Sequence, residues 1–153
     1  MDINLKVIDL RKEFHNIKNL IDEGIQVPLL VTGNSMSPFL KHLRDTIYIS
    51  KIDGQLRKGD IVFYVRTNGQ FVMHRIHHID TYGYYYMIGD AQREIEGPLD
   101  GSCIFGIIKK AVRKNSIIDE NDFIWWFFQK VWIRIVPLRG LGKKVYAVLR
   151  KLK

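Results

Sequence analysis

The sequence has few of the residues that hold small secreted domains together, and it lacks long apolar runs. Its 153 residues include one cysteine, Cys103, so no internal disulfide can form. Charge appears early at the N-terminus, which has no apolar run of about 7–15 residues like that of a secretory leader. No stretch approaches the roughly 18 consecutive apolar residues of a spanning helix. We therefore expect a protein on the cytoplasmic side of the membrane.

Acidic residues are missing from one end of the chain. Residues 130–153 contain eight Lys and Arg and no Asp or Glu, and they account for the whole formal net charge of +8. All three tryptophans lie just before or within this stretch. Aromatic rings beside cations are typical of a helix at a membrane surface, but a terminal helix that caps the core shows the same pattern. We expect peripheral membrane contact through residues 123–153, and no nucleic-acid partner.

Apolar residues recur at helical spacing first and in short strand-like runs afterwards. A stripe of them predicts a helix over residues 3–23, ended by Gly24. Runs of β-branched and aromatic residues between turn signals then predict strands over residues 29–32, 46–50, 60–66, 71–79, 84–88 and 102–112. The expected fold class is mainly β with terminal helices (α+β), a compact antiparallel sheet or barrel. Its expected parts are an amphipathic helix (1–24), a β domain (25–118) and an aromatic, basic helical segment (119–153).

Ser35 is the candidate nucleophile. Gly33 and Asn34 precede it and Pro38 follows, which is typical of a tight turn at a strand end. Backbone N–H groups around Asn34 to Met36 would then be free to hold an oxyanion. An ordinary turn also fits this segment when it is considered alone.

His74 is the candidate general base. Strand alternation places Val72, His74, Ile76 and His78 on one face of the strand predicted at 71–79. Burial there would lower the pKa of His74 and keep its ring neutral, as a general base requires. A core histidine bonded to a carbonyl fits equally well, and His78 is the second choice of base.

Asp90 is the candidate carboxylate partner of His74. A hairpin through Tyr82 and Gly83 would bring the end of the next strand, and with it Asp90, towards the histidine. Other acidic residues follow closely, and Glu96 is the reserve. No spacing of His and Cys is typical of a metal site, so we expect neither a metal nor another cofactor.

Five short motifs follow one another in an order known from one group of enzymes. They are Ser35-Met36-Ser37-Pro38, Arg44-Asp45, Lys58-Gly59-Asp60-Ile61-Val62, His74-Arg75-Ile76 and Gly89-Asp90. Together they resemble the signal peptidase family, within the superfamily that includes the LexA-type self-cleaving repressors. The resemblance covers roughly residues 31–112.

The resemblance implies a serine-type endopeptidase. His74 stands where lysine stands in the common bacterial enzymes, so the subtype resembled is the histidine-base one of the endoplasmic reticulum, archaea and sporulation. This implies Ser35 as nucleophile, His74 as base and Asp90 as carboxylate, with Glu96 six positions later in reserve. It also implies a coiled, mostly antiparallel β-structure and a peptide or preprotein substrate bound in extended form, with small residues before the cut.

Members of that family have a transmembrane anchor, and because this sequence contains no apolar run of that length, we expect none here. The N-terminal helix and the aromatic, basic tail suggest attachment to the inner membrane surface instead. Maturation of a small peptide or of a cytoplasmic partner fits such an enzyme better than removal of secretory signal peptides. The alternative function is a non-catalytic peptide-binding or membrane-surface adaptor module on the same fold.

Overall fold

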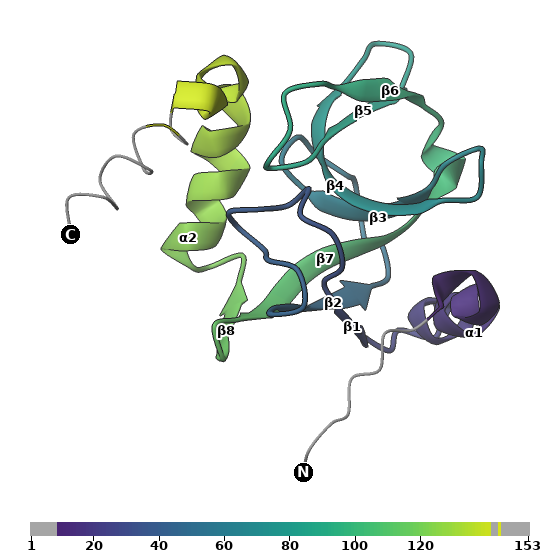
Figure 1. Ribbon diagram of the computed structural model, residues 1–153. Helices are drawn as coiled ribbons and strands as arrows, with labels where there is room; N and C mark the ends of the chain where they lie inside the picture. Colours follow the sequence, from purple (N-terminus) through teal and green to yellow (C-terminus); the bar gives the residue numbers. More distant parts are fainter. Residues whose placement is uncertain (1–8, 142–143, 145–153) are drawn as a thin grey trace.

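The computed structural model describes residues 9–141 and residue 144, and its fold is mainly an antiparallel sheet (Figure 1). An N-terminal helix and short C-terminal helices flank the sheet. The strands are β1 (Val27–Leu30), β2 (Thr46–Ser50), β3 (Ile61–Val65), β4 (Phe71–Ile79), β5 (Tyr85–Ile88), β6 (Glu96–Leu99), β7 (Ile104–Arg113) and β8 (Ser116–Asp119).

The sheet is open. Neighbouring strands follow the order β1-β2-β7-β3-β4-β5-β6, and β8 pairs with β7. The expected antiparallel sheet is therefore confirmed, but the barrel form of that expectation is wrong because the sheet does not close. Irregular register in β7, against both β2 and β3, bends the sheet. As a result, residues of β1 and β4, which are distant in the strand order, line one cavity.

Two apolar clusters fill the space on either side of the sheet's centre. Four successive residues of β3, from Ile61 to Tyr64, are buried, so this strand is covered on both faces. One cluster joins β3 to both terminal helical segments, and the other lies between β3, β4 and β5. The site described below lies beside the first half of β4, next to β1.

The N-terminal helix, α1 (Leu10–Asp22), packs against the sheet through one face. Asp9 caps it by accepting a bond from the N–H of Arg11, and Ile17 and Ile21 are buried. Phe14 packs against an aromatic ring of β4 and another of β7. The helix was expected from residue 3, but residues 1–8 lie outside the described part of the chain.

The C-terminal helical segment covers the other side of the core. It consists of α2 (Phe123–Trp126), η2 (Phe127–Val131), η3 (Trp132–Arg134) and η4 (Val136–Leu138). Trp125 is only 2% exposed and, with Phe128, packs against Phe39. The segment therefore caps the core, one of the two roles considered for its aromatic residues.

The helical run breaks before Pro137, and the short turn η4 contains this proline. Of residues 142–153, which contain five of the eight basic residues at this end, the structure describes Lys144, and the others lie outside the described part of the chain. Within the part of the chain that the structure describes, no helix has the length and apolar character needed to cross a bilayer.

Candidate active site

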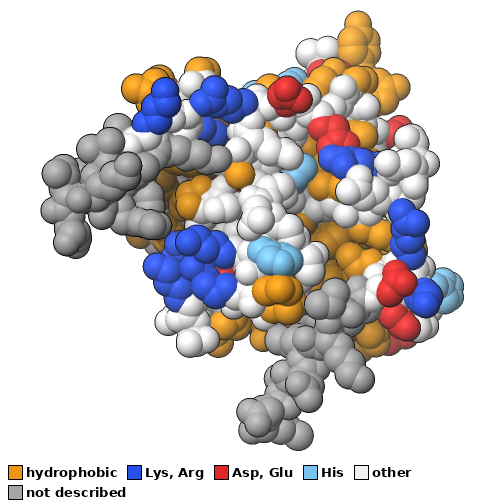
Figure 2. Space-filling model, in the orientation of Figure 1, with side chains coloured by type: hydrophobic (Ala, Val, Ile, Leu, Met, Phe, Trp, Pro, Cys, Tyr) orange, Lys and Arg blue, Asp and Glu red, His pale blue; other side chains and the backbone are white. Residues whose placement is uncertain are grey.

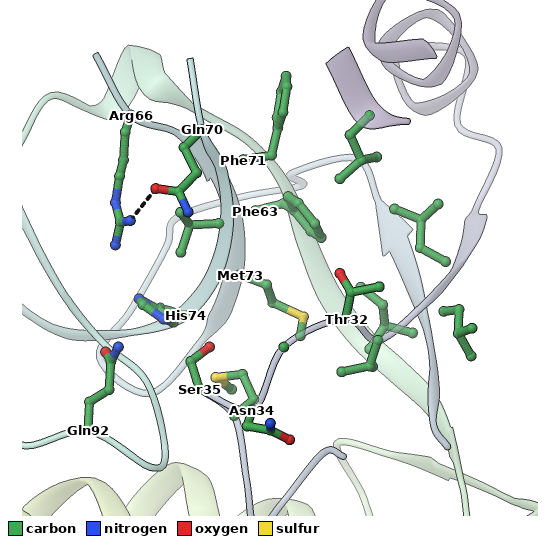
Figure 3. Close-up of a pocket in the computed structure, with 18 of the residues that line it drawn as sticks. Thr32, Asn34, Ser35, Phe63, Arg66, Gln70, Phe71, Met73, His74 and Gln92 are labelled. Atoms are coloured by element: carbon green, nitrogen blue, oxygen red, sulfur yellow. Dashed lines mark hydrogen bonds between the residues drawn. The ribbon is translucent and has the colours of Figure 1, made fainter. Parts of the chain in front are cut away.

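A cavity of about 320 Å³ lies between β1 and β4, with Ser35 and His74 at one end (Figure 3). Its far end reaches Pro28 in β1 and Leu10 in α1. Hydrophobic side chains also gather on this face of the molecule beside α1 (Figure 2). Apolar side chains of β1 and β4 line much of the cavity, and polar side chains that include Arg66 and Gln70 line it on the His74 side (Figure 3).

Ser35 lies in the turn that follows β1, and hydrogen bonds to the turn's backbone hold it in place. The Gly33 N–H donates to Nδ1 of His42 over 2.8 Å, and the carbonyl of Ser35 accepts from the Ala91 N–H over 2.8 Å. A Cβ added to Gly89 would lie 2.5 Å from the Ser35 carbonyl oxygen, so only glycine allows this approach. The Gly89-Asp90 motif therefore supports the serine turn through its backbone.

Backbone donors are available beside Ser35. Within the described residues, the N–H groups of Asn34, Ser35 and Met36 take part in no hydrogen bond, and the Asn34 carbonyl accepts from the Ser37 N–H. The Met36 side chain is buried in the core and anchors this stretch of backbone. Two adjacent free N–H groups next to a serine hydroxyl could stabilise an oxyanion.

His74 lies in β4 opposite Val62 of β3, and the residue is 2% exposed. Burial, which disfavours the imidazolium, lowers the pKa of His74 to about 4 against the attraction of Glu96. The ring is therefore neutral at pH 7. Figure 3 shows it beside Ser35 in the cavity, although no direct hydrogen bond joins these two described side chains. Catalytic hydrogen bonds are often long in enzymes without substrate, so the absence of a direct bond between Ser35 and His74 is compatible with a catalytic pair.

The far side of the His74 ring contacts a buried tyrosine. The Tyr64 hydroxyl lies 3.1 Å from Nδ1 of His74 and donates to Oε2 of Glu96 over 2.8 Å. Arg66 holds the same carboxylate with two bonds of 2.7 Å. These bonds to Arg66 lower the pKa of Glu96, and burial beside Glu96 raises the pKa of Tyr64. Glu96, the reserve carboxylate, is thus connected to His74 through Tyr64.

Asp90, the expected partner of His74, contacts a different residue. Its Oδ1 accepts from Nε of Arg75 over 2.8 Å, and both side chains are fully buried. Adjacent residues of a strand point to opposite faces, so His74 and Arg75 cannot both serve one carboxylate. The expected Asp90–His74 contact is therefore not formed, and Asp90 is part of a buried ion pair.

His78, the second choice of base, lies away from the cavity. An irregularity in the pairing of β4 with β5 between Ile76 and His78 disturbs the simple alternation. The ring of His78 stacks on Tyr86, and its Nδ1 lies 2.8 Å from Nδ1 of His77. Of the two histidines on the expected face, His74 is the one that lines the cavity with Ser35.

The remaining motifs hold the surrounding backbone. Asp45 is buried and accepts two bonds of 2.7 Å from Arg44 and one from the Lys41 N–H. Gly59 has φ +94°, and a Cβ there would lie 2.6 Å from the carbonyl oxygen of Gln129. These contacts fix the serine loop and the C-terminal segment, respectively, and neither residue lines the cavity.

Among the residues described, no group of three or more His, Cys, Asp and Glu is placed to hold a metal ion. Comparison with known proteins adds no relative: no family model, curated protein or solved structure matches the chain. The motifs and the geometry of the site are therefore the basis for its function.

Proposed function

We propose that this protein is a serine endopeptidase of the signal peptidase type, with Ser35 as nucleophile and His74 as general base. One observation carries the proposal. Two residues 39 positions apart in the sequence line the same end of one cavity, and burial keeps the histidine neutral. The bent, open antiparallel sheet is also compatible with the coiled β-structure of that family.

The chemistry follows from these positions. Oγ of Ser35 attacks the substrate carbonyl while His74 takes the hydroxyl proton, and the free N–H groups of Ser35 and Met36 receive the developing oxyanion. Each such donor contributes about 3 kcal/mol in other hydrolases. His74 then gives the proton to the leaving amine, and water releases the acyl group from Ser35 by the same steps in reverse.

The edge of β1 can bind an extended peptide. The Val31 N–H donates to the Asp45 carbonyl, which continues the β1–β2 pairing. Because hydrogen bonds alternate along an antiparallel pair, the backbone groups of Leu30 and Thr32 point away from β2. Both residues line the cavity. Pro28, which has no N–H to donate, occupies another outward position, as expected of an edge strand.

The first half of β4 offers a second edge. The Arg66 N–H donates to the Gln70 carbonyl, so by alternation the backbone groups of Phe71 and Met73 point away from β3. On that side β5 pairs with β4 only from Arg75 onward. A peptide lying between the two edges would reach Ser35 in extended form, which supports an endopeptidase over an exopeptidase.

The direct test is cleavage of a randomised peptide library followed by mass spectrometry. The wild type should produce new internal cleavage products, and Ser35→Ala and His74→Ala should produce none. Ser37→Ala, which changes a serine of the same turn, and His15→Ala, on the exposed face of α1, should cleave like the wild type. Binding of peptides without cleavage would favour the alternative, a non-catalytic peptide-binding module.

Membrane contact is a second proposal, and the outer face of the C-terminal helical segment favours it. Phe123 is 73% and Trp126 46% exposed, with their rings stacked 5.6 Å apart. Lys130 and Arg134 follow on later turns and are exposed as well. Aromatic rings followed by cations suit the headgroup region of an anionic bilayer.

Co-sedimentation with phosphatidylglycerol vesicles tests this contact. The protein should sediment with these vesicles and much less with phosphatidylcholine vesicles. Replacing Phe123 and Trp126 together by serine should reduce the bound fraction several-fold, since ring insertion and charge attraction act together. Tyr82→Ser, which removes another exposed aromatic ring, should bind like the wild type. Equal binding by the double variant would disprove the contact.

A further inference from the structure

A row of four side chains leads from His74 towards the protein surface. Tyr64 is fully buried, and its hydroxyl has two partners, Nδ1 of His74 at 3.1 Å and Oε2 of Glu96 at 2.8 Å. Arg66 fixes Glu96 through both oxygens and is itself bonded to Gln70 over 2.7 Å. The longest contact in this row is therefore the one between Tyr64 and His74, and the bonds on the Glu96 side of Tyr64 are all shorter.

The hydrogen-bond chemistry of the row sets the direction of its protons. A carboxylate bound by a guanidinium is ionised and can only accept hydrogen bonds. The single proton of the Tyr64 hydroxyl must then point to Glu96. Towards His74 the phenolic oxygen can therefore only accept. A hydrogen bond between it and Nδ1 of His74 forms only if Nδ1 carries a proton.

We propose that Tyr64 is a positioning residue that holds His74 in the Nδ1–H tautomer. Because a neutral imidazole carries one ring proton, Nε2 then keeps its lone pair. Nε2 is the nitrogen without a partner among the hydrogen bonds of His74 in the described structure. The tautomer chosen by Tyr64 is the one in which this nitrogen can accept the proton of Ser35.

The catalytic role of the tautomer rests on the proposed function. The proton positions on Tyr64 and His74 follow from the hydrogen bonds alone. In the Ser-His-Asp arrangement a carboxylate contacts the histidine directly and both fixes the tautomer and stabilises the imidazolium. Here a phenol stands between Glu96 and His74, and the negative charge acts through it. When His74 gains a proton, Nδ1–H keeps donating to Tyr64, whose own proton stays directed at Glu96.

The test is a measurement of the His74 ring nitrogens by long-range ¹H–¹⁵N NMR at pH 7, with the signals assigned by their loss in His74→Gln. The wild type should show a protonated Nδ1 and an unprotonated Nε2. Tyr64→Phe keeps the ring and removes the hydroxyl, and it should give a tautomer mixture or the Nε2–H form. Glu96→Gln should act in the same direction, because the new amide can donate to Tyr64 and free its proton for Nδ1.

Kinetics supply the second readout. Tyr64→Phe should lower kcat by at least about 10-fold with little change in KM, because the wrong tautomer cannot take the serine proton. Tyr48→Phe, a tyrosine that contacts Lys110 on another face of the sheet, is the matched control and should keep wild-type kcat. The same loss is expected for Glu96→Gln, which provides a second variant if Tyr64→Phe does not fold.

The outcomes separate this inference from the proposed function. An Nε2–H tautomer in the wild type would overturn the role of Tyr64 even if the protein cleaves peptides. The role of Tyr64 would also be overturned if the protein cleaves peptides and Tyr64→Phe leaves both the His74 tautomer and kcat unchanged. The predicted tautomer in a protein that cleaves no peptide would leave the inferred proton direction intact and overturn the peptidase.

Discussion

At the scale of single residues, burial of His74 makes the stability of the fold depend on pH. Its pKa is about 4 in the folded protein and near 6.5 in an unfolded chain. Between these values the unfolded state binds a proton that the folded state does not, so stability falls as the pH falls. The loss is about 1.4 kcal/mol per pH unit and roughly 3 kcal/mol in all.

Urea unfolding at pH 7, 6 and 5 measures this effect. The free energy of unfolding of the wild type should drop steadily over this range, and that of His74→Gln should drop much less. His77, whose pKa burial also lowers, contributes a smaller slope that remains in both proteins. His15→Gln, an exposed control, should behave like the wild type. A wild-type slope equal to that of His74→Gln would contradict a buried neutral histidine.

Ser35 and His74 line one cavity, whereas the predicted contact between Asp90 and His74 is not formed. Motif order brings Gly89-Asp90 near β4, but it does not say whether Asp90 meets His74 or its neighbour Arg75 on the opposite face. Burial decides this, because an unpaired Arg75 in the core would cost far more than a histidine without a carboxylate. Here Asp90 neutralises Arg75.

Tyr64 was missed because its role depends on cross-strand geometry. Alternation along β3 does place Tyr64 and Val62 on one face, and Val62 pairs with His74. The signal was therefore present in the sequence, but it could be used only with the register of β3 against β4. A tyrosine in an apolar strand otherwise looks like an ordinary core residue.

At the scale of elements, the predicted strands all occur, and each begins and ends within two residues of its expected bounds. β6 was missed because Gly97 and Pro98 within it are strong turn residues, and an edge strand tolerates a proline that a central strand would not. β8 was missed because its four residues, Ser116–Asp119, are too short for a periodic pattern. Pairing with a neighbour, rather than local preference, forms both strands.

The C-terminal helical segment shows what a composition-based interpretation cannot resolve. Trp125 is buried and Trp126 is exposed, although they are neighbours in the sequence. A helix turns about 100° per residue, so adjacent residues fall on different faces. The aromatic run supplies both a core cap and an exposed surface. Which rings are buried and which are exposed depends on how the helix packs on the sheet.

The contact between Gly59 and the C-terminal segment gives a prediction at this scale. Gly59→Ala must adopt φ +94° and place its Cβ against the Gln129 carbonyl, and both effects destabilise the fold. Gly54 has a similar φ of +88° but open space around its Cβ position, so Gly54→Ala carries the backbone strain alone. We expect a loss of about 1 kcal/mol for Gly54→Ala and clearly more for Gly59→Ala.

Chemical denaturation of both variants measures the difference. The excess loss in Gly59→Ala reports the packing of the C-terminal segment against the loop before β3. Equal losses for the two variants would mean that Gln129 moves away at little cost, and that this segment is not firmly held by the loop.

At the scale of the whole molecule, the bend of the sheet creates the site. Ser35 follows β1 at one end of the strand order, and His74 lies in β4, with β2, β7 and β3 between them. The irregular pairing of β7 bends the sheet so that both residues reach one cavity. Sequence patterns predict strands and turns but not this bend, which depends on register shifts between strands far apart in the chain.

The most direct measurement for the whole account is reaction with a fluorophosphonate, which forms a covalent adduct only with an activated serine. Intact mass and peptide mapping should show one adduct, located on Ser35, at pH 7. Labelling should disappear in Ser35→Ala and slow strongly in His74→Ala, and Ser37→Ala should label at the wild-type rate. No adduct on the folded wild type, or equal labelling of Ser35→Ala, would contradict a Ser35–His74 hydrolase.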